Sequence, residues 1–187
     1  MVWLVIFIRL TFLFLFIRQV IIISLAIWTW QKSEIPYEPT QTKALKKLMT
    51  KIQLEPGQKI YDLGSGNGKV ALFLAKREAV KVVGLEKNLV LYLISQFKKI
   101  FSFKLKGQVV FKHQDLFTIN LSDADLVYTY FVPSVFNKIT DKFVAELKTN
   151  SLLVTWRFPF QHPAFKLIDQ FETRHTMYLY QKQSTKK

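Results

Sequence analysis

Three glycines stand at every second position in the run YDLGSGNGKV, which spans residues 61–70. Gly64, Gly66 and Gly68 follow one short apolar run and precede another. Glycine adopts positive φ readily and lets the backbone approach a ligand that a Cβ would block. A helix beginning near Gly68 or Lys69 would also present free N–H groups to an anionic group such as a carboxylate. The loop therefore predicts a ligand site, with a tight strand-to-helix turn as the alternative.

The glycine spacing is G-x-G-x-G, whereas a dinucleotide-binding loop reads G-x-G-x-x-G. Lys69 stands where that loop would have its third glycine. The spacing alone is a weak signal, so the residues that follow decide which ligand is expected.

Three acids accompany the loop. Glu86 ends the second apolar run, where a carboxylate accepts hydrogen bonds from the ribose hydroxyls of a nucleoside cofactor. Asp115 follows the third run and could reach an adenine amino group, with Leu116 and Phe117 covering the ring. Asp62 could bond the loop's own N–H groups or an ammonium on the cofactor. The alternatives are a solvated carboxylate for Glu86 and a helix N-cap for Asp115.

An alternation of strand and helix patterns must position these residues. Strands are predicted at residues 58–63, 80–86, 107–115, 125–131 and 151–158, and helices at 42–52, 69–77, 88–103 and 133–148. Two further alternating runs, 165–172 and 176–182, predict an antiparallel hairpin at one edge. The pattern indicates an α/β fold with a doubly wound, mostly parallel sheet, whose ligands bind at the carboxyl ends of the strands.

Residues 1–30 are almost entirely apolar and predict one transmembrane helix, about 45 Å long. Arg9 and Arg18 oppose insertion by at most about 5 to 7 kcal/mol, against about −5 to −10 kcal/mol from the Leu, Ile, Val and Phe residues. The alternatives are a surface helix and a cleaved signal peptide. The two arginines lie on opposite helical faces, and no basic segment precedes the apolar run, so both alternatives are disfavoured.

The predicted domains are therefore an anchor at 1–30, a linker and lead-in helix at 31–55, and the α/β domain with the ligand site at 56–187. No Lys or Arg precedes the anchor, whereas Lys32, Lys43, Lys46 and Lys47 follow it. This bias predicts a single-pass membrane protein with its C-terminal domain on the cytoplasmic side.

The chain carries 27 Lys and Arg residues against 13 Asp and Glu residues. A cluster of five lysines stands out: Lys98, Lys99, Lys104, Lys106 and Lys112. Anionic lipid, nucleic acid, an acidic protein or a merely solvated surface would account for it. The anchor favours lipid, and no nucleic-acid recognition motif is present. The absence of cysteine excludes disulfides, zinc–thiolate sites and a cysteine nucleophile.

The strings YDLGSGNGKVALFLAK, VVGLEKN and HQDLF resemble motifs I, post-I and II of class I S-adenosylmethionine-dependent methyltransferases. The resemblance covers roughly residues 56–182 and implies a Rossmann-like fold with S-adenosylmethionine as cofactor. PYEPTQTKALKKLM, DADLVYTYFVPSVF and WRFPF are similar to one family within this class. That family contains the membrane-anchored protein-lysine methyltransferases of the ATP synthase c-subunit and the adenine nucleotide translocase, together with prokaryotic relatives.

The resemblance also implies residue roles. The methionine part of the cofactor would be surrounded by Asp62, Gly64, Ser65, Gly66, Asn67 and Gly68. Glu86 would hold the ribose, Asp115 with Leu116 the adenine, and Pro39 with Thr40 would close over the cofactor. The methyl-transfer pocket, with the candidate catalytic residues, would be lined by Tyr130, Phe131, Val132 and Pro133. No metal site is expected.

The expected function is membrane-anchored methyl transfer to a lysine of a membrane-associated protein. An aromatic pocket would lower the pKa of the acceptor amine. His113 and His162 are candidate bases by residue type, but we expect structural roles for both. The alternatives are methylation of a lipid or quinone-like molecule and a non-catalytic, membrane-bound cofactor-binding protein. The acceptor, the number of methyl groups transferred and the oligomeric state do not follow from the sequence.

Overall fold

The computed structural model describes residues 2–31 and 38–184, with residue 5 and residues 25–31 described by their backbone alone. The chain divides into two compact units, Met1–Glu34 and Ile35–Lys187. Residues 32–37, within the predicted linker and lead-in segment at 31–55, lie outside the described residues. The lead-in helix belongs to the second unit, together with the sheet.

The first unit is dominated by one helix, α1 (Val2–Gln31). Its described apolar side chains are exposed around the helix, as in a helix whose natural surroundings are apolar. The hydroxyl of Thr11 donates to the carbonyl oxygen of Phe7 at 2.9 Å, so its polarity is satisfied within the helix. By length and composition Val2–Ser24 could cross a membrane, and an N-terminal signal sequence would meet the same criteria.

The second unit is built on a seven-stranded sheet of order β3-β2-β1-β4-β5-β7-β6. The strands are β1 (Lys59–Leu63), β2 (Lys81–Glu86), β3 (Gln108–His113), β4 (Leu126–Thr129), β5 (Leu152–Trp156), β6 (Phe165–Glu172) and β7 (Thr176–Lys182). The first five strands pair in parallel, and β7 lies antiparallel between β5 and β6. The predicted mostly parallel sheet with a C-terminal hairpin is confirmed. Its strand order reverses between β1 and β4, where α/β sheets bind their ligands.

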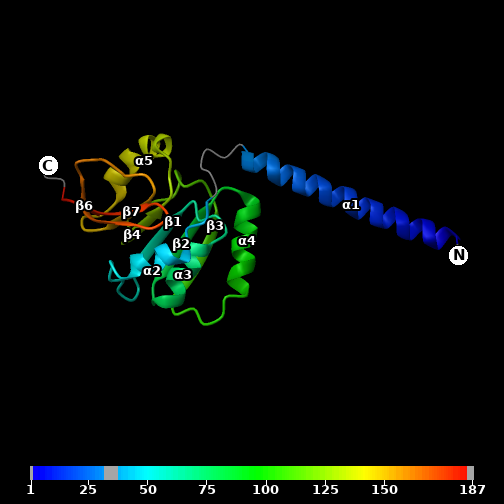
Figure 1. The fold of residues 1–187 in the computed structure, drawn as a ribbon, viewed down its shortest axis with the longest axis horizontal. Coiled ribbons are helices and arrows are strands. Elements are labelled where there is room, and N and C mark those ends of the chain that lie inside the picture. Colours follow the sequence, from blue (N-terminus) through cyan, green and yellow to red (C-terminus); the bar gives the residue numbers. More distant parts are fainter. Residues whose placement is uncertain (1, 32–37, 185–187) are drawn as a thin grey trace. The chain divides into compact units, whose positions relative to one another are not determined.

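Helices cover both faces of this sheet (Figure 1). The helices are α2 (Thr42–Met49), α3 (Lys69–Arg77), α4 (Leu89–Ile100) and α5 (Pro133–Glu146). One buried apolar cluster joins α2 and α3 to the sheet, and a second joins α5 to the opposite face. Because every residue of β4 is buried, this strand is a rigid support for the side chains that follow it.

Helix α4 is shorter than its sequence pattern predicts, since residues 101–103 lie outside it. The Ser102 hydroxyl donates to the carbonyl oxygen of Lys98 at 2.7 Å, and the Ser102 N–H donates to that of Lys99 at 3.0 Å. Lys104 then adopts a positive φ of 62°. Local serine hydrogen bonds and this left-handed residue therefore end the helix, although apolar residues continue beyond it.

Candidate active site

The glycine loop connects β1 to α3 at the carboxyl edge of the sheet. Gly64, Gly66 and Gly68 have φ values of 75°, 53° and 76°. The N–H groups of Gly64 and Ser65 both donate to the carbonyl oxygen of Leu85, at 2.9 and 2.8 Å. The loop is therefore fixed to the end of β2 in a conformation that favours glycine at all three positions.

The glycines differ in what surrounds them. A Cβ on Gly68 would lie 2.4 Å from Cζ of Phe111, so this glycine is required by packing against β3. A Cβ on Gly64 would meet only Cε1 of Phe131, at 3.8 Å, and Gly64 is exposed. Gly64 thus leaves open backbone for a ligand, while Gly68 lets α3 and β3 approach each other.

Glu86 holds this loop from the end of β2. Its Oε2 accepts from the Gly66 N–H, and its Oε1 accepts from the Asn88 N–H, both at 2.8 Å. Each carboxylate oxygen keeps a second lone pair, so Glu86 could also accept from hydroxyl groups of a ligand. The position fits the predicted contact with a ribose.

Asp62 lies beneath the loop and is 2% exposed. Its Oδ2 accepts from the Ala71 N–H of α3 at 3.2 Å. Burial raises the pKa of Asp62 to about 7, the Ala71 N–H opposes the rise, and the charge of Glu86 adds to it. In the structure Asp62 therefore bonds the first turn of α3, which is neither of the two partners considered from the sequence, and its contact with an ammonium of the cofactor stays a prediction.

Asp115 is engaged by its own surroundings. Its Oδ2 pairs with Nζ of Lys87 at 2.9 Å, and its Oδ1 accepts from the Phe117 N–H at 3.1 Å. Burial acts to raise the pKa of Asp115, but the Lys87 ammonium and the Phe117 N–H outweigh it and lower the pKa. Leu116 is buried, whereas Phe117 is 39% exposed. Contact of Asp115 with an adenine remains a prediction. One of its carboxylate oxygens is already used in the local turn, where it accepts from the Phe117 N–H.

The segment before α2 crosses to the carboxyl ends of β4 and β5. Thr40 is buried, and its Oγ1 lies 2.8 Å from the hydroxyl oxygen of Tyr128 on β4. Pro39 is exposed. Glu38 accepts at Oε2 from the Tyr130 hydroxyl at 3.1 Å and at Oε1 from Nε2 of His175 at 3.1 Å. Hydrogen bonds of Glu38 and Thr40 thus hold the segment against the sheet on both sides of Pro39.

Two arginines complete this cluster. Arg157 lies 3.4 Å from Oε2 of Glu38 and donates to the Tyr130 hydroxyl at 3.1 Å, and Arg174 lies 3.5 Å from Oε1. Burial acts to raise the pKa of Glu38, but hydrogen bonds from His175 and Tyr130 and nearby positive charge lower it overall. Arg157 has a φ of 77°, an uncommon conformation for a residue with a side chain. Such strain is concentrated at functional sites.

Aromatic rings surround Tyr130. The Trp156 ring lies 5.3 Å from that of Tyr130 and 5.3 Å from that of His175, and the Phe158 ring is stacked 6.5 Å from that of Tyr130. Phe131 is fully buried among the side chains that join α5 to the sheet. Its Cε1 would lie 3.8 Å from a Cβ on Gly64, and it is 0% exposed in this structure, so its predicted place in the methyl-transfer pocket stays a prediction. Pro133 is the first residue of α5.

Sequence reasoning missed Glu38, Arg157 and His175. The strings PYEPT and WRFPF contain the first two, so the family resemblance could have identified them. His175 lies between β6 and β7, and no local spacing distinguishes it. The two histidines considered from sequence have structural bonds: His113 Nε2 lies 2.9 Å from the Lys87 carbonyl oxygen, and His162 Nδ1 accepts from the Ala164 N–H at 3.1 Å.

The strand order, the antiparallel β7 and the glycine loop with its acid on β2 define a class I S-adenosylmethionine-dependent methyltransferase fold. The sequence profile described as the ANTKMT methyltransferase domain matches residues 62–165. The chain belongs to this family, and its cofactor is S-adenosylmethionine.

Relatives and solved structures agree with this assignment. The adenine nucleotide translocase lysine N-methyltransferase of Mus musculus is 27% identical over 126 residues, covering 67% of this chain and 54% of that protein. The chain thus spans about half the length of this relative. A protein-lysine N-methyltransferase of Saccharolobus islandicus is 26% identical over 152 residues, covering 78% and 92%. An RNA methyltransferase from Salinibacter ruber in complex with S-adenosyl-L-homocysteine shares the fold, with a TM-score of 0.72, 21% identity and coverage of 80% and 97%.

The residues present fit this cofactor. Gly64 is open, Glu86 retains acceptor capacity, and the buried Ser65 hydroxyl has no hydrogen-bond partner among the described residues. A buried hydroxyl without a partner is unfavourable unless a ligand or water satisfies it. Within residues 2–31 and 38–184, no group of three or more His, Cys, Asp or Glu side chains could hold a metal ion.

Proposed function

We propose that the protein is a membrane-anchored S-adenosylmethionine-dependent methyltransferase that methylates a lysine of a membrane-associated protein. The observation that carries the proposal is the joint presence of the family's glycine loop and the aromatic group around Tyr130, at neighbouring strand ends. Two relatives by sequence are lysine N-methyltransferases by name, one of them acting on the adenine nucleotide translocase. The apolar helix α1 supports anchoring.

The bound cofactor would supply a methyl group already activated on a sulfonium. The residues of this chain would then act by binding and alignment. The glycine loop, Ser65 and Glu86 would fix the cofactor, while Tyr130 would position the acceptor amine. An apolar aromatic surrounding disfavours the ammonium and so lowers the pKa of the acceptor lysine. Exclusion of water and alignment would supply most of the rate enhancement.

The test is transfer of a radiolabelled methyl group from the cofactor into membranes of a strain lacking the protein. Purified full-length protein is added, and protein and lipid are then separated before counting. We expect label in a membrane protein, as methyl-lysine by mass spectrometry. The Gly66→Val variant is the control for transfer by this site. Label found only in extracted lipid or quinone would replace the lysine assignment with the small-molecule alternative.

Anchoring and sidedness are tested separately. A reporter fused after Lys187 should report the cytoplasmic side, because Lys32, Lys43, Lys46 and Lys47 follow the apolar helix and such a basic flank stays on the cytoplasmic side. The protein should also stay in the membrane pellet during alkaline carbonate washing. Release by carbonate would mean that Arg9 and Arg18 prevent insertion, even if methyl transfer by the second unit is intact.

A further inference from the structure

Helix α4 has its polarity reversed relative to a helix of a water-soluble domain. Ser95 is the one buried residue of this fully described helix, and it lies between the half-buried Tyr92 and Gln96 on the side that packs on the sheet. The outward side carries large apolar residues: Leu89, Leu93, Phe97 and Ile100 are 52%, 55%, 63% and 72% exposed. Helices in soluble domains normally place such residues toward the core.

The apolar surface continues past the end of the helix. Phe101 and Phe103 are 57% and 74% exposed. We call the surface formed by Leu89, Leu93, Phe97, Ile100, Phe101 and Phe103 the α4 face. A contiguous apolar surface of this kind marks a site of interaction with a protein or a membrane.

The stretch of chain that contains α4 carries charge of one sign. Residues 87–114 contain six lysines and no Asp or Glu, and of these lysines Lys87 pairs with Asp115 just beyond the stretch. A basic helix with Leu, Ile and Phe on one side is typical of helices that lie in the interface of an anionic bilayer. The same chain also carries α1, which is apolar enough to cross a membrane. The ten residues from 32 to 41 span no more than about 35 Å, so inserted α1 would keep the second unit close to lipid.

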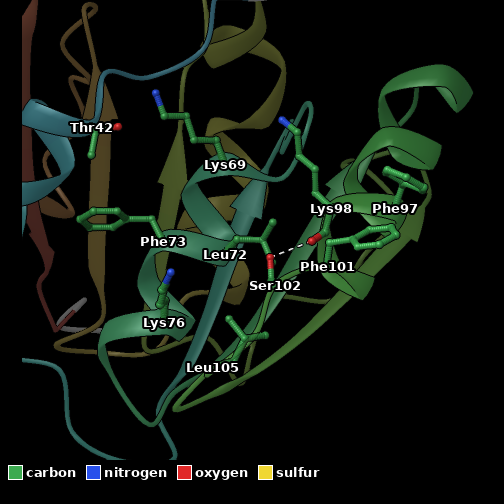
Figure 2. Close-up of a pocket in the computed structure, with 10 residues that line it drawn as sticks. All are labelled: Thr42, Lys69, Leu72, Phe73, Lys76, Phe97, Lys98, Phe101, Ser102 and Leu105. Carbon is green, nitrogen blue, oxygen red and sulfur yellow. Dashed lines mark hydrogen bonds between the residues drawn. The ribbon is translucent and has the colours of Figure 1, made fainter.

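A groove of about 490 Å³ adjoins the α4 face, between α3 and α4. Its lysines are Lys69, Lys76 and Lys98, and its apolar walls include Leu72, Phe73, Phe97 and Phe101. Figure 2 shows the Lys69 and Lys98 side chains extending toward the same end of the groove, with Leu105 at the other end. Burial and the charge of Lys69 lower the pKa of Lys98. Two cations beside apolar walls fit an acidic headgroup with the start of its acyl chain.

We propose that the α4 face docks on a bilayer surface containing acidic phospholipid, with the groove receiving one headgroup. Asn88, which caps α4, is bonded to Glu86, so the docked helix begins at the cofactor loop. Docking would therefore bring the opening of the site to the lipid interface. The proposal concerns binding alone and does not depend on the methyl acceptor.

The absence of cysteine makes a site-specific test direct. The full chain carrying Phe97→Cys is labelled with a polarity-sensitive fluorophore and reconstituted into vesicles of phosphatidylcholine, with or without phosphatidylglycerol. The matched control is Asn137→Cys, an exposed position on α5. We expect a blue shift and quenching by brominated lipid for the Phe97 label in acidic vesicles only, weakened by salt. The Asn137 label should stay aqueous in both.

Two results would overturn the proposal. A Phe97 label that stays aqueous in acidic vesicles would show that the face does not meet lipid, and would favour an acidic protein partner. A Phe97 label that is equally shielded from water in lipid-free detergent and in both kinds of vesicle would show that α1 or a second copy of the chain covers the α4 face.

Charge and apolar contributions are separated with the label at Ile100→Cys. Replacing Lys98, Lys104 and Lys106 by Gln should lower the docking constant about fivefold per lysine. Leu93→Gln should also weaken docking while leaving the melting temperature in detergent unchanged, because Leu93 is exposed. A fall in melting temperature would instead mean that the side of α4 carrying Leu93 packs against the rest of the protein, and would contradict the proposal.

Discussion

At the scale of single residues, the three glycines of the loop serve different ends. Gly68 is fixed by the nearby Phe111 ring, whereas Gly64 leaves open backbone. Gly66 donates its N–H to Glu86, which is the residue expected to hold the ribose. The glycine pattern therefore serves both packing and access for a ligand. Substitutions at its three positions should impair the protein for different reasons.

Gly66→Val should abolish binding of S-adenosylmethionine, as measured by calorimetry on the detergent-solubilised full chain. Valine disfavours the positive φ at this position and would disturb the N–H that Glu86 holds. The control is Gly57→Val, which places the same side chain at a φ of 85° with nothing within 4 Å. Both variants should lose stability by roughly 1–2 kcal/mol, but only Gly66→Val should lose binding. Loss in both would attribute the effect to general strain.

Asp62 makes a second prediction at this scale. Its pKa is raised from 3.8 to about 7 in the folded protein, so the folded state binds the proton more tightly than the unfolded state. The contribution of Asp62 to stability is therefore greatest below the unfolded pKa and is lost as pH rises toward 7. Relative to Asp62→Asn, the wild type should lose about 2 to 3 kcal/mol of unfolding free energy between pH 5 and pH 8. Urea unfolding at both pH values measures this difference, and a constant difference would show that Asp62 is ionised throughout.

At the scale of elements, the segment before α2 is bonded to the ends of three strands. Thr40 forms a hydrogen bond with Tyr128 of β4. Glu38 forms hydrogen bonds with Tyr130, which follows β4, with Arg157, which follows β5, and with His175, which precedes β7. An acid held by these partners stays beside the aromatic group expected to receive the acceptor. The described part of this segment, residues 38–41, is thus held at the ends of β4 and β5 and at the start of β7.

The roles of the Tyr130 ring and hydroxyl can be separated. Tyr130→Ala should retain cofactor binding and lose methyl transfer, because the ring that aligns the acceptor is gone. Tyr130→Phe keeps the ring but removes the hydrogen bonds with Glu38 and Arg157. We expect it to retain transfer with a raised KM, and Glu38→Gln to behave in the same way. If Tyr130→Phe is as inactive as Tyr130→Ala, the hydroxyl and not the ring is the essential group.

Phe131 is fully buried, so we expect its substitution to act first on stability. Phe131→Ala should lower the unfolding free energy by about 3–5 kcal/mol, the usual effect of truncating a buried phenylalanine. Any loss of transfer should then follow the loss of folded protein, measured by thermal unfolding beside activity. If Phe131→Ala is as stable as the wild type but transfers no methyl group, Phe131 would belong to the acceptor pocket, as the family resemblance implies.

At the scale of the whole molecule, an apolar helix and a basic domain occur in one chain. The domain after residue 30 retains 25 of the 27 basic residues, since Arg9 and Arg18 precede it. Tethering to a membrane raises the effective concentration of targets there without any new contact. The two units should therefore be separable in their effects: cofactor chemistry in one, and access to substrate in the other.

Removal of residues 1–30 should leave cofactor binding unchanged, because the glycine loop and its acids all lie in the second unit. Methylation of the native membrane substrate in cells should fall sharply. Calorimetry and mass spectrometry of methyl-lysine measure the two effects, with a foreign transmembrane helix in place of residues 1–30 as the control. Failure of that helix to restore methylation would mean that α1 contributes more than a tether.

The sequence by itself determined the alternation of strands and helices, the glycine loop and the expected cofactor, because periodicity and short motifs are local properties. It also pointed to Glu86, whose place at a strand end follows from its neighbours. Tertiary structure decided the partners of Glu38 and His175, which are 137 positions apart in the sequence and meet only where strand ends converge. It also decided that Phe131 is buried and that the apolar side of α4 faces outward. Apolar periodicity predicts a helix with one apolar side, but which side meets the sheet depends on how the whole domain packs.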